Sequence, residues 1–140
     1  MKNVFILLAV FLTISCGNIS TAQAPDAVKE AFQKKYPNEN DPDWHQDKNG
    51  YYEANFKKDG EHFRADYKED GSWVETESSI KKKDLPKAVR DRIKKEYDDY
   101  KIYEIEKVDH HSKGRFYDVE FKIDGKKKDI EFNEQGEKIN

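Results

Sequence analysis

Residues 25–36, PDAVKEAFQKKY, return in closely similar form as PKAVRDRIKKEY at 86–97, and this duplication decides the fold. Residues 51–60, YYEANFKKDG, return as FYDVEFKIDG at 116–125. The offset is 61 residues for the first pair and 65 for the second, and the extra residues fall in the longer loop at 109–114. Similar units that follow one another along a chain indicate a tandem repeat.

Each unit is predicted to open with an amphipathic helix. Apolar residues recur every four positions in both copies, namely Val28, Phe32, Tyr36, Val89, Ile93 and Tyr97. That spacing places them on one stripe of a helix, and charged residues occupy the opposite face. The stripe of each helix therefore needs an apolar surface to pack against.

The segments after each helix alternate apolar and polar residues, which is typical of strands with one buried face. Asp-Gly pairs at 59–60, 70–71 and 124–125 favour tight hairpins, so neighbouring strands are predicted to be antiparallel. Each half thus reads as a helix followed by four strands, an α+β arrangement. Because a half of about 55–60 residues buries too little apolar surface alone, we expect one shared core or one continuous sheet, with both helices on the same face.

The first 24 residues differ from the rest and resemble a signal peptide. Lys2 precedes the uninterrupted apolar run at 4–12, and small residues follow as far as Ala24. Cleavage is possible after Ala22 or after Ala24. We therefore assign 1–24 to a signal peptide and 25–140 to the mature domain, with repeats at 25–79 and 84–140.

A second export signal overlaps the first. The residues Thr13-Ile14-Ser15-Cys16 partly match a bacterial lipobox, in which the cysteine is acylated and becomes the new N-terminus. Cys16 is otherwise removed with the signal peptide. Both interpretations predict an exported protein, either periplasmic or secreted, that contacts a membrane only through a lipid anchor at Cys16.

Composition excludes several classes of protein. Lys and Arg number 26 against 29 Asp and Glu, so the chain lacks the excess positive charge of a nucleic-acid-binding protein. The single cysteine allows no internal disulfide, and no thiol remains after residue 24. Eight Phe, eight Tyr and two Trp favour a folded domain over a disordered one.

The residues Leu85-Pro86-x-Ala88-Val89, Lys35-Tyr36-Pro37 and the Asp-Gly hairpins resemble the PepSY-like family, from Pro25 to Ile139. Members are described as β-lactamase-inhibitor-like exported bacterial proteins, common in Bacteroidetes. The resemblance implies helices on one side of a curved antiparallel sheet whose other side is open. It implies no established reaction and no cofactor.

Motifs for catalysis or metal binding are weak. The acidic segment 41–50 fails as a calcium loop, since Gln46 stands where glycine is required and Tyr52 where glutamate is required. The His110–His111 pair lacks further ligands at zinc spacing. No nucleophile elbow or phosphate-binding glycine loop occurs, so we predict a non-enzyme without metal or cofactor. A hydrolase that uses His45 or His62 remains an alternative.

The polar face of the sheet supplies the candidate binding residues. By alternation or repeat alignment, five side chains are predicted to share it: Tyr51, His62, Arg64, Trp73 and Phe116. Aromatic and arginine side chains on a rigid sheet are typical of protein-binding hot spots. The main hypothesis is a non-catalytic protein that binds another exported protein through this face. The family resemblance implies that the partner is a protease or another exported enzyme, which the protein inhibits or regulates. The alternative is a carrier of a peptide, glycan or lipid between helices and sheet.

Overall fold

The computed structural model describes residues 23–140. The predicted signal peptide up to Ala22 and the proposed lipidation at Cys16 lie outside the described residues. The elements, in chain order, are α1 (Asp26–Lys35), β1 (Asp43–Gln46), β2 (Tyr52–Lys58), β3 (Glu61–Tyr67), β4 (Trp73–Ser79), the short 3-10 helix η1 (Lys82–Asp84), α2 (Lys87–Glu96), β5 (Lys101–His110), β6 (Gly114–Ile123) and β7 (Lys126–Phe132). Within this part of the chain, no helix is long and apolar enough to cross a membrane.

All seven strands form one antiparallel sheet in the order β1-β2-β3-β4-β5-β6-β7. The α+β class and the single continuous sheet are thereby confirmed. The junction between the halves is itself a strand pairing, because Glu77, Ser78 and Ser79 belong to β4 and pair with Val108, Lys107 and Glu106 of β5. The β4–β5 ladder therefore joins the two halves directly.

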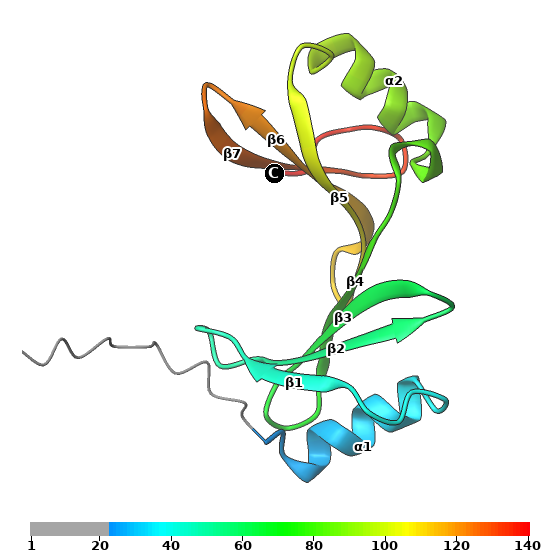
Figure 1. The fold of residues 1–140 in the computed structure, drawn as a ribbon, viewed down its shortest axis with the longest axis vertical. Coiled ribbons are helices and arrows are strands. Elements are labelled where there is room, and N and C mark those ends of the chain that lie inside the picture. Colours follow the sequence, from blue (N-terminus) through cyan, green and yellow to red (C-terminus); the bar gives the residue numbers. More distant parts are fainter. Residues whose placement is uncertain (1–22) are drawn as a thin grey trace, which may run out of the picture.

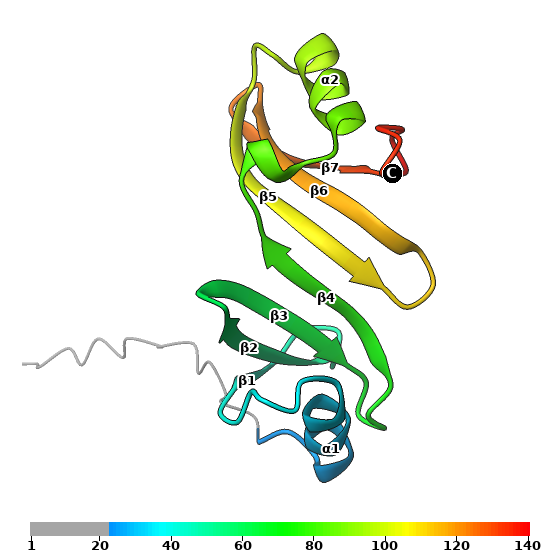
Figure 2. The same cartoon turned by 90° about the vertical axis from the view of Figure 1, so that its right-hand side faces the viewer.

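Both helices cover the same face of the sheet, as predicted. Along the register, Ala54 lies opposite Ala65 and Ala65 opposite Thr76, while Val119 lies opposite Ile130. These positions face the helices. Figure 1 shows the sheet curving like a C, with α2 outside one half and α1 outside the other. Figure 2, the view from the convex side, shows β4 and β5 exposed between the two helices. The concave face, which we call the open face, carries no helix within residues 23–140.

Each helix packs on its own half of the sheet. The N-terminal cluster consists of Ala24, Val28, Phe32, Ala54, Phe56, Ala65 and Tyr67. The C-terminal cluster consists of Leu85, Val89, Ile93, Tyr97, Ile105, Tyr117, Val119, Phe121, Ile130 and Phe132. The halves therefore share a sheet but have separate apolar cores.

A glycine contact positions each helix on its sheet. A Cβ on Gly71 would lie 2.6 Å from the carbonyl oxygen of Ala27, and a Cβ on Gly136 would lie 2.6 Å from that of Ala88. Both glycines have positive φ angles, +83° and +77°, which favour glycine in the turn. The two halves differ at their ends, because the expected fourth strand of the second half is reduced to an isolated bridge between Phe132 and Lys138.

Candidate functional site: the open face of the sheet

The open face carries carboxylates that lie directly opposite one another on neighbouring strands. Three acidic rows run across the strands: Glu53–Asp66–Glu75, Glu106–Asp118–Glu131 and Glu104–Glu120–Asp129. Their members alternate along each strand with residues that face the helices, so strand alternation directs them to the open side. Like charges directly opposite each other destabilise a sheet. This arrangement therefore lowers the stability of the fold.

A hollow in this face brings residues of both halves together. It has a volume of about 210 Å³ and is lined by Arg64, Glu77, Glu104, Glu106, Asp118, Glu120 and Asp129. Arg64 and Glu77 come from the first half, and the other residues come from β5, β6 and β7. The hollow exists because the β4–β5 ladder joins the halves and the sheet curves toward this side (Figure 1).

Arg64 is the cation at the centre of this surface. One of its terminal nitrogens, Nη2, lies 2.7 Å from Glu77 Oε1, and its Nε lies 3.3 Å from Asp66 Oδ1. The side chains of Asp66 and Glu77 are only 7% and 12% exposed. Removing carboxylates from water is costly unless a cation compensates. Arg64 therefore offsets part of the charge of both residues.

Besides Arg64, two lysines reach the acidic rows, whereas other carboxylates of the hollow form no ion pair within residues 23–140. Lys127 Nζ lies 2.8 Å from Glu120 Oε1, and Lys113 Nζ lies 3.1 Å from Glu131 Oε2. Over residues 23–140, four carboxylates of the hollow form no ion pair, namely Glu104, Glu106, Asp118 and Asp129. The negative charge of these four acids is therefore not compensated by an ion pair within the described residues.

Burial and mutual repulsion raise the pKa values of these acids. Desolvation raises the pKa of Asp66 to about 7 and that of Glu77 to about 8, although the Arg64 guanidinium acts in the opposite direction. The pKa of Asp118 rises to about 6 because it is desolvated and lies near Asp129, Glu131 and Glu106. Desolvation also raises the pKa of Glu106. The open face thus changes charge across the neutral pH range.

The raised pKa values predict that the protein is most stable on the acidic side of neutrality. Between the unfolded and folded pKa values of Asp66, Glu77 and Asp118, the folded state binds more protons than the unfolded state, so stability falls as pH rises. We expect Tm to increase by roughly 4 °C from pH 8.5 to pH 5.5, which corresponds to about 1 kcal/mol.

Differential scanning calorimetry across this pH range measures that increase. The Glu77→Gln variant should show a smaller increase, because it lacks the carboxyl group with the highest of the three pKa values. A Tm that falls steadily from pH 8.5 to 5.5 would contradict this electrostatic description of the open face.

The structure distributes the predicted binding residues unevenly. Arg64 lies in the hollow, and His62 is exposed beside it, in a neighbouring depression that Arg64, Glu77 and Glu106 also line. Tyr51 precedes β2, is partly exposed and donates its backbone N–H to Asp47 Oδ1 at 2.8 Å. The structure therefore brings together only His62 and Arg64 of the five.

The predicted position of Trp73 on the open face is wrong. A β-bulge between Asp66 and Tyr67 shifts the register, so Tyr67 pairs with Trp73 and both face α1. Trp73 packs against the N-terminal cluster, and its indole N–H donates to Thr76 Oγ1 at 3.0 Å. Lys35 Nζ lies 3.9 Å from the centre of the indole ring system. A bulge changes which side of a sheet the following residues face.

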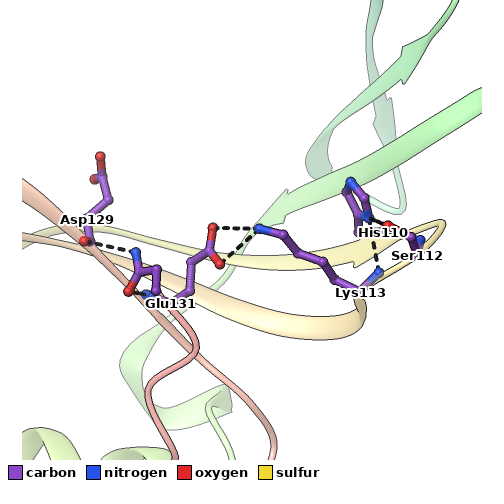
Figure 3. A network of polar contacts seen from close by, with 6 residues as sticks. His110, Ser112, Lys113, Asp129 and Glu131 are labelled. Carbon is purple, nitrogen blue, oxygen red and sulfur yellow. Dashed lines mark hydrogen bonds and ion pairs between the residues drawn. The ribbon is translucent and has the colours of Figure 1, made fainter.

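Phe116 does belong to the open face, but the expectation of an exposed ring is wrong. It lies opposite Val108 and is only 4% exposed. Lys113 Nζ lies 5.0 Å from the centre of its ring and also pairs with Glu131. Figure 3 shows this connection between Lys113 and Glu131, with the His110 side chain accepting hydrogen bonds from the β5–β6 turn. Phe116 therefore stabilises the surface from beneath and offers no exposed aromatic contact.

The acidic rows were not predicted from the sequence. The signal was present in the alternating acids of β5, β6 and β7, such as Glu104 with Glu106 and Asp118 with Glu120. Only the strand register shows that these acids lie opposite one another. Across residues 23–140, no group of His, Cys, Asp or Glu side chains is arranged to hold a metal ion.

The fold defines a class of α+β proteins in which two helices back one side of a curved antiparallel sheet. The family model described as "Putative beta-lactamase-inhibitor-like, PepSY-like" matches residues 13–58 and 50–137. The chain therefore belongs to this family, as the sequence resemblance indicated.

Solved structures of similar fold come from Bacteroides species. A DUF2874-family protein of Bacteroides ovatus has a TM-score of 0.77 at 24% identity, over 85% of this chain and 86% of its own. A protein of Bacteroides eggerthii, described as a "putative periplasmic" protein, has a TM-score of 0.75 at 27% identity, over 85% and 88%. A BLIP-like protein of Bacteroides fragilis has a TM-score of 0.76 at 23% identity, over 86% of each chain. No curated protein matches the sequence.

Proposed function

We propose that this protein is a non-catalytic binding protein that engages another exported protein through the open face. The observation that carries this proposal is the set of acidic rows, in which Glu106, Asp118 and Glu131 lie opposite one another without serving the apolar cores. Groups that lower stability and remain on an uncovered, rigid surface are typical of functional sites.

The kind of partner follows from the family. The family description and the BLIP-like relative from Bacteroides fragilis both refer to inhibitors of β-lactamase. We extend the inhibitory role in these descriptions to this chain and propose an inhibitor or regulator of an exported enzyme. Proteins of similar fold can bind different targets, so the target of this protein has to be identified by experiment.

Export is part of the same proposal. The similar Bacteroides eggerthii protein is described as periplasmic, and the first 24 residues have the composition of a signal peptide. Ala24 is 2% exposed and belongs to the N-terminal cluster. Cleavage after Ala22, or lipidation at Cys16, would leave this residue in the mature protein, whereas cleavage after Ala24 would remove it from the core.

The tandem repeat is likewise a proposal about origin and construction. It is supported by the equivalent contacts of Gly71 with Ala27 and of Gly136 with Ala88. It is also supported by the two separate apolar clusters, each beneath its own helix. On this view, the open face arose where two units joined edge to edge through β4 and β5.

A carrier of small ligands is the second candidate. A groove of about 250 Å³ on the α1 side of the sheet is lined by Lys35, Tyr36, Lys58, Phe63, Trp73, Thr76 and Asp109. Aromatic rings with a few polar groups suit a glycan or a peptide side chain. The groove lies between helix and sheet, where the sequence analysis placed a carrier site.

Site-specific photo-crosslinking in the native cell envelope tests the proposal. A photoreactive residue replaces Glu104, which is exposed on the open face, or Lys94, which is exposed on α2. We expect a defined protein adduct from position 104 and none from position 94. Adducts from position 94 alone would contradict docking through the open face. Adducts from neither position, together with a bound small molecule detected by mass spectrometry, would favour the carrier.

A further inference from the structure

We propose that the partner inserts lysine or arginine side chains of a basic segment into the hollow of the open face. This inference rests on the proposed function and specifies the chemistry of the partner. The contact point is the part of the hollow formed by Glu104, Glu106, Asp118 and Asp129, which form no ion pairs within the described part of the chain.

The first support is the cross-strand arrangement of these acids. Glu106 lies opposite Asp118, and Glu120 lies opposite both Glu104 and Asp129. Such like-charge pairs repel each other, and a cation placed between them would convert repulsion into attraction. A basic segment therefore gains more on this surface than on one with mixed charges.

The second support is a buried acceptor without a hydrogen bond. Asp66 is 5% exposed, and its Oδ1 accepts no hydrogen bond. The nearest cation is Arg64, whose Nε lies 3.3 Å away without hydrogen-bond geometry. The register places Asp66 between Glu53 and Glu75 on the open face. Buried polar atoms normally have partners, so the cations of this chain compensate the acids of the open face only in part.

Asp118, which lines the hollow itself, also has a buried carboxylate oxygen without a hydrogen bond. Its Oδ1 is inaccessible to solvent and accepts no hydrogen bond, and the residue lies between Glu106 and Glu131 in its row. Because lysine and arginine carry only donors, their head groups fit a site whose unfilled atoms are acceptors. A carboxylate or phosphate ligand would instead add a further negative charge.

Arg64 shows how the surface holds a cation. Its guanidinium lies between two largely buried acids, with Glu77 at 2.7 Å and Asp66 at 3.3 Å. A guanidinium or ammonium group of the partner would bind similarly among Glu106, Asp118 and Asp129. This internal precedent shows that carboxylates of the open face hold a guanidinium by charge attraction.

The charge of the whole molecule is distributed to favour this approach. The chain carries a formal charge of only −3, but the acidic rows concentrate negative charge on the concave side. The open face has its own cations in Arg64, Lys113 and Lys127. On the other side of the sheet, the last turns of the two helices carry four lysines, namely Lys34, Lys35, Lys94 and Lys95. A hollow lined mostly by acids, with Arg64 as its one lining cation, focuses a negative field and accelerates association with a positively charged partner.

Binding of a defined basic peptide to the purified protein tests the inference. The probe is a fluorescently labelled decalysine, compared with decaglutamate, and anisotropy is measured at pH 8 in 50 mM salt. We expect saturable binding of decalysine only. The double variant Glu106→Gln/Asp118→Asn should weaken it about tenfold, because two charge contacts in the hollow are removed.

The control variant changes the net charge of the protein by the same amount, but at positions on the helices. Glu30→Gln/Asp91→Asn removes two exposed acids on α1 and α2 and should weaken binding less than about twofold, because these acids lie outside the hollow. The hollow variants relieve repulsion, so calorimetry should show an unchanged or higher Tm, and unfolding cannot explain their weaker binding. Equal losses in both double variants, or binding of decaglutamate, would overturn the inference.

A lower pH supplies a second measurement. Protonation of Asp118, whose pKa is raised to about 6, removes negative charge from the hollow, so decalysine should bind about tenfold more weakly at pH 5.5 than at pH 8. Unchanged or tighter binding at pH 5.5 would overturn the inference.

If crosslinks at position 104 capture a partner while decalysine does not bind, the inference fails and the proposed function stands. If decalysine binds in the hollow but no crosslink forms at position 104, the proposed function fails instead.

Discussion

Replacing Gly136 by alanine is expected to destabilise the protein by about 3 kcal/mol, since a forced left-handed residue costs about 1–2 kcal/mol and the clash adds to it. The new Cβ would lie 2.6 Å from the Ala88 carbonyl oxygen and 2.8 Å from its carbonyl carbon. These are backbone atoms at the start of α2, and α2 cannot shift easily because Val89 and Ile93 are fully packed. Urea unfolding of the variant measures the loss.

Gly125→Ala is the matched control. Gly125 has the same φ of +77°, but a Cβ added there would have no neighbouring atom within 4 Å. Replacing Gly125 by alanine should therefore lower the free energy of unfolding only by the cost of the left-handed backbone conformation, about 1–2 kcal/mol. The first half repeats this comparison, because Gly71 and Gly60 share a φ of +83° and only Gly71 approaches a helix. Similar losses at Gly136 and Gly125 would show that the helix contact does not matter.

Replacing Arg64 by methionine is expected to destabilise the protein by about 2–3 kcal/mol at pH 8.5, somewhat below the usual range for a fully buried pair because Arg64 is partly exposed. The substitution leaves the carboxylates of Asp66 and Glu77 without their cation in a largely desolvated position. Methionine keeps an unbranched apolar stem like that of arginine, so the loss reports charge more than packing. Thermal unfolding at fixed salt measures it.

The loss should shrink as the pH falls, and this distinguishes charge from packing. Without Arg64, Asp66 and Glu77 take up protons more readily, so at pH 5.5 both are neutral and no longer require a cation. Arg115→Met is the control, because Arg115 pairs with Asp109 where both side chains are well exposed, and it should cost less than about 1 kcal/mol at either pH. A loss at Arg64 that is equal at pH 5.5 and 8.5 would contradict the charge explanation.

The elements of the fold could be predicted because their signals are local. Val28 and Phe32 mark the stripe of α1, and Val89 and Ile93 mark that of α2, and all four are buried as expected. The alternation of Ala54 and Phe56 marks β2 in the same way. Helix and strand periods depend only on residues a few positions apart, so the sequence carries them fully.

The candidate site was harder to predict because it depends on contacts between distant residues. Alternation correctly placed Arg64 on the open face, but the bulge at Asp66 and Tyr67 moved Trp73 to the other side. Phe116 faces the open side as expected, yet Lys113 from the β5–β6 turn covers its ring. Neither a one-residue bulge nor the path of a long side chain has a local signature.

The sequence by itself determined the helices, the antiparallel strands, the turn glycines and the family. Only the tertiary structure decided which acids lie opposite one another, and that both halves contribute to one hollow around Arg64. The physical reason is that side chains alternate along a strand with a period of two, whereas the identity of the opposite residue depends on register. Register is set by turns, bulges and packing between segments far apart in the chain, and these decide where the charge of this protein gathers.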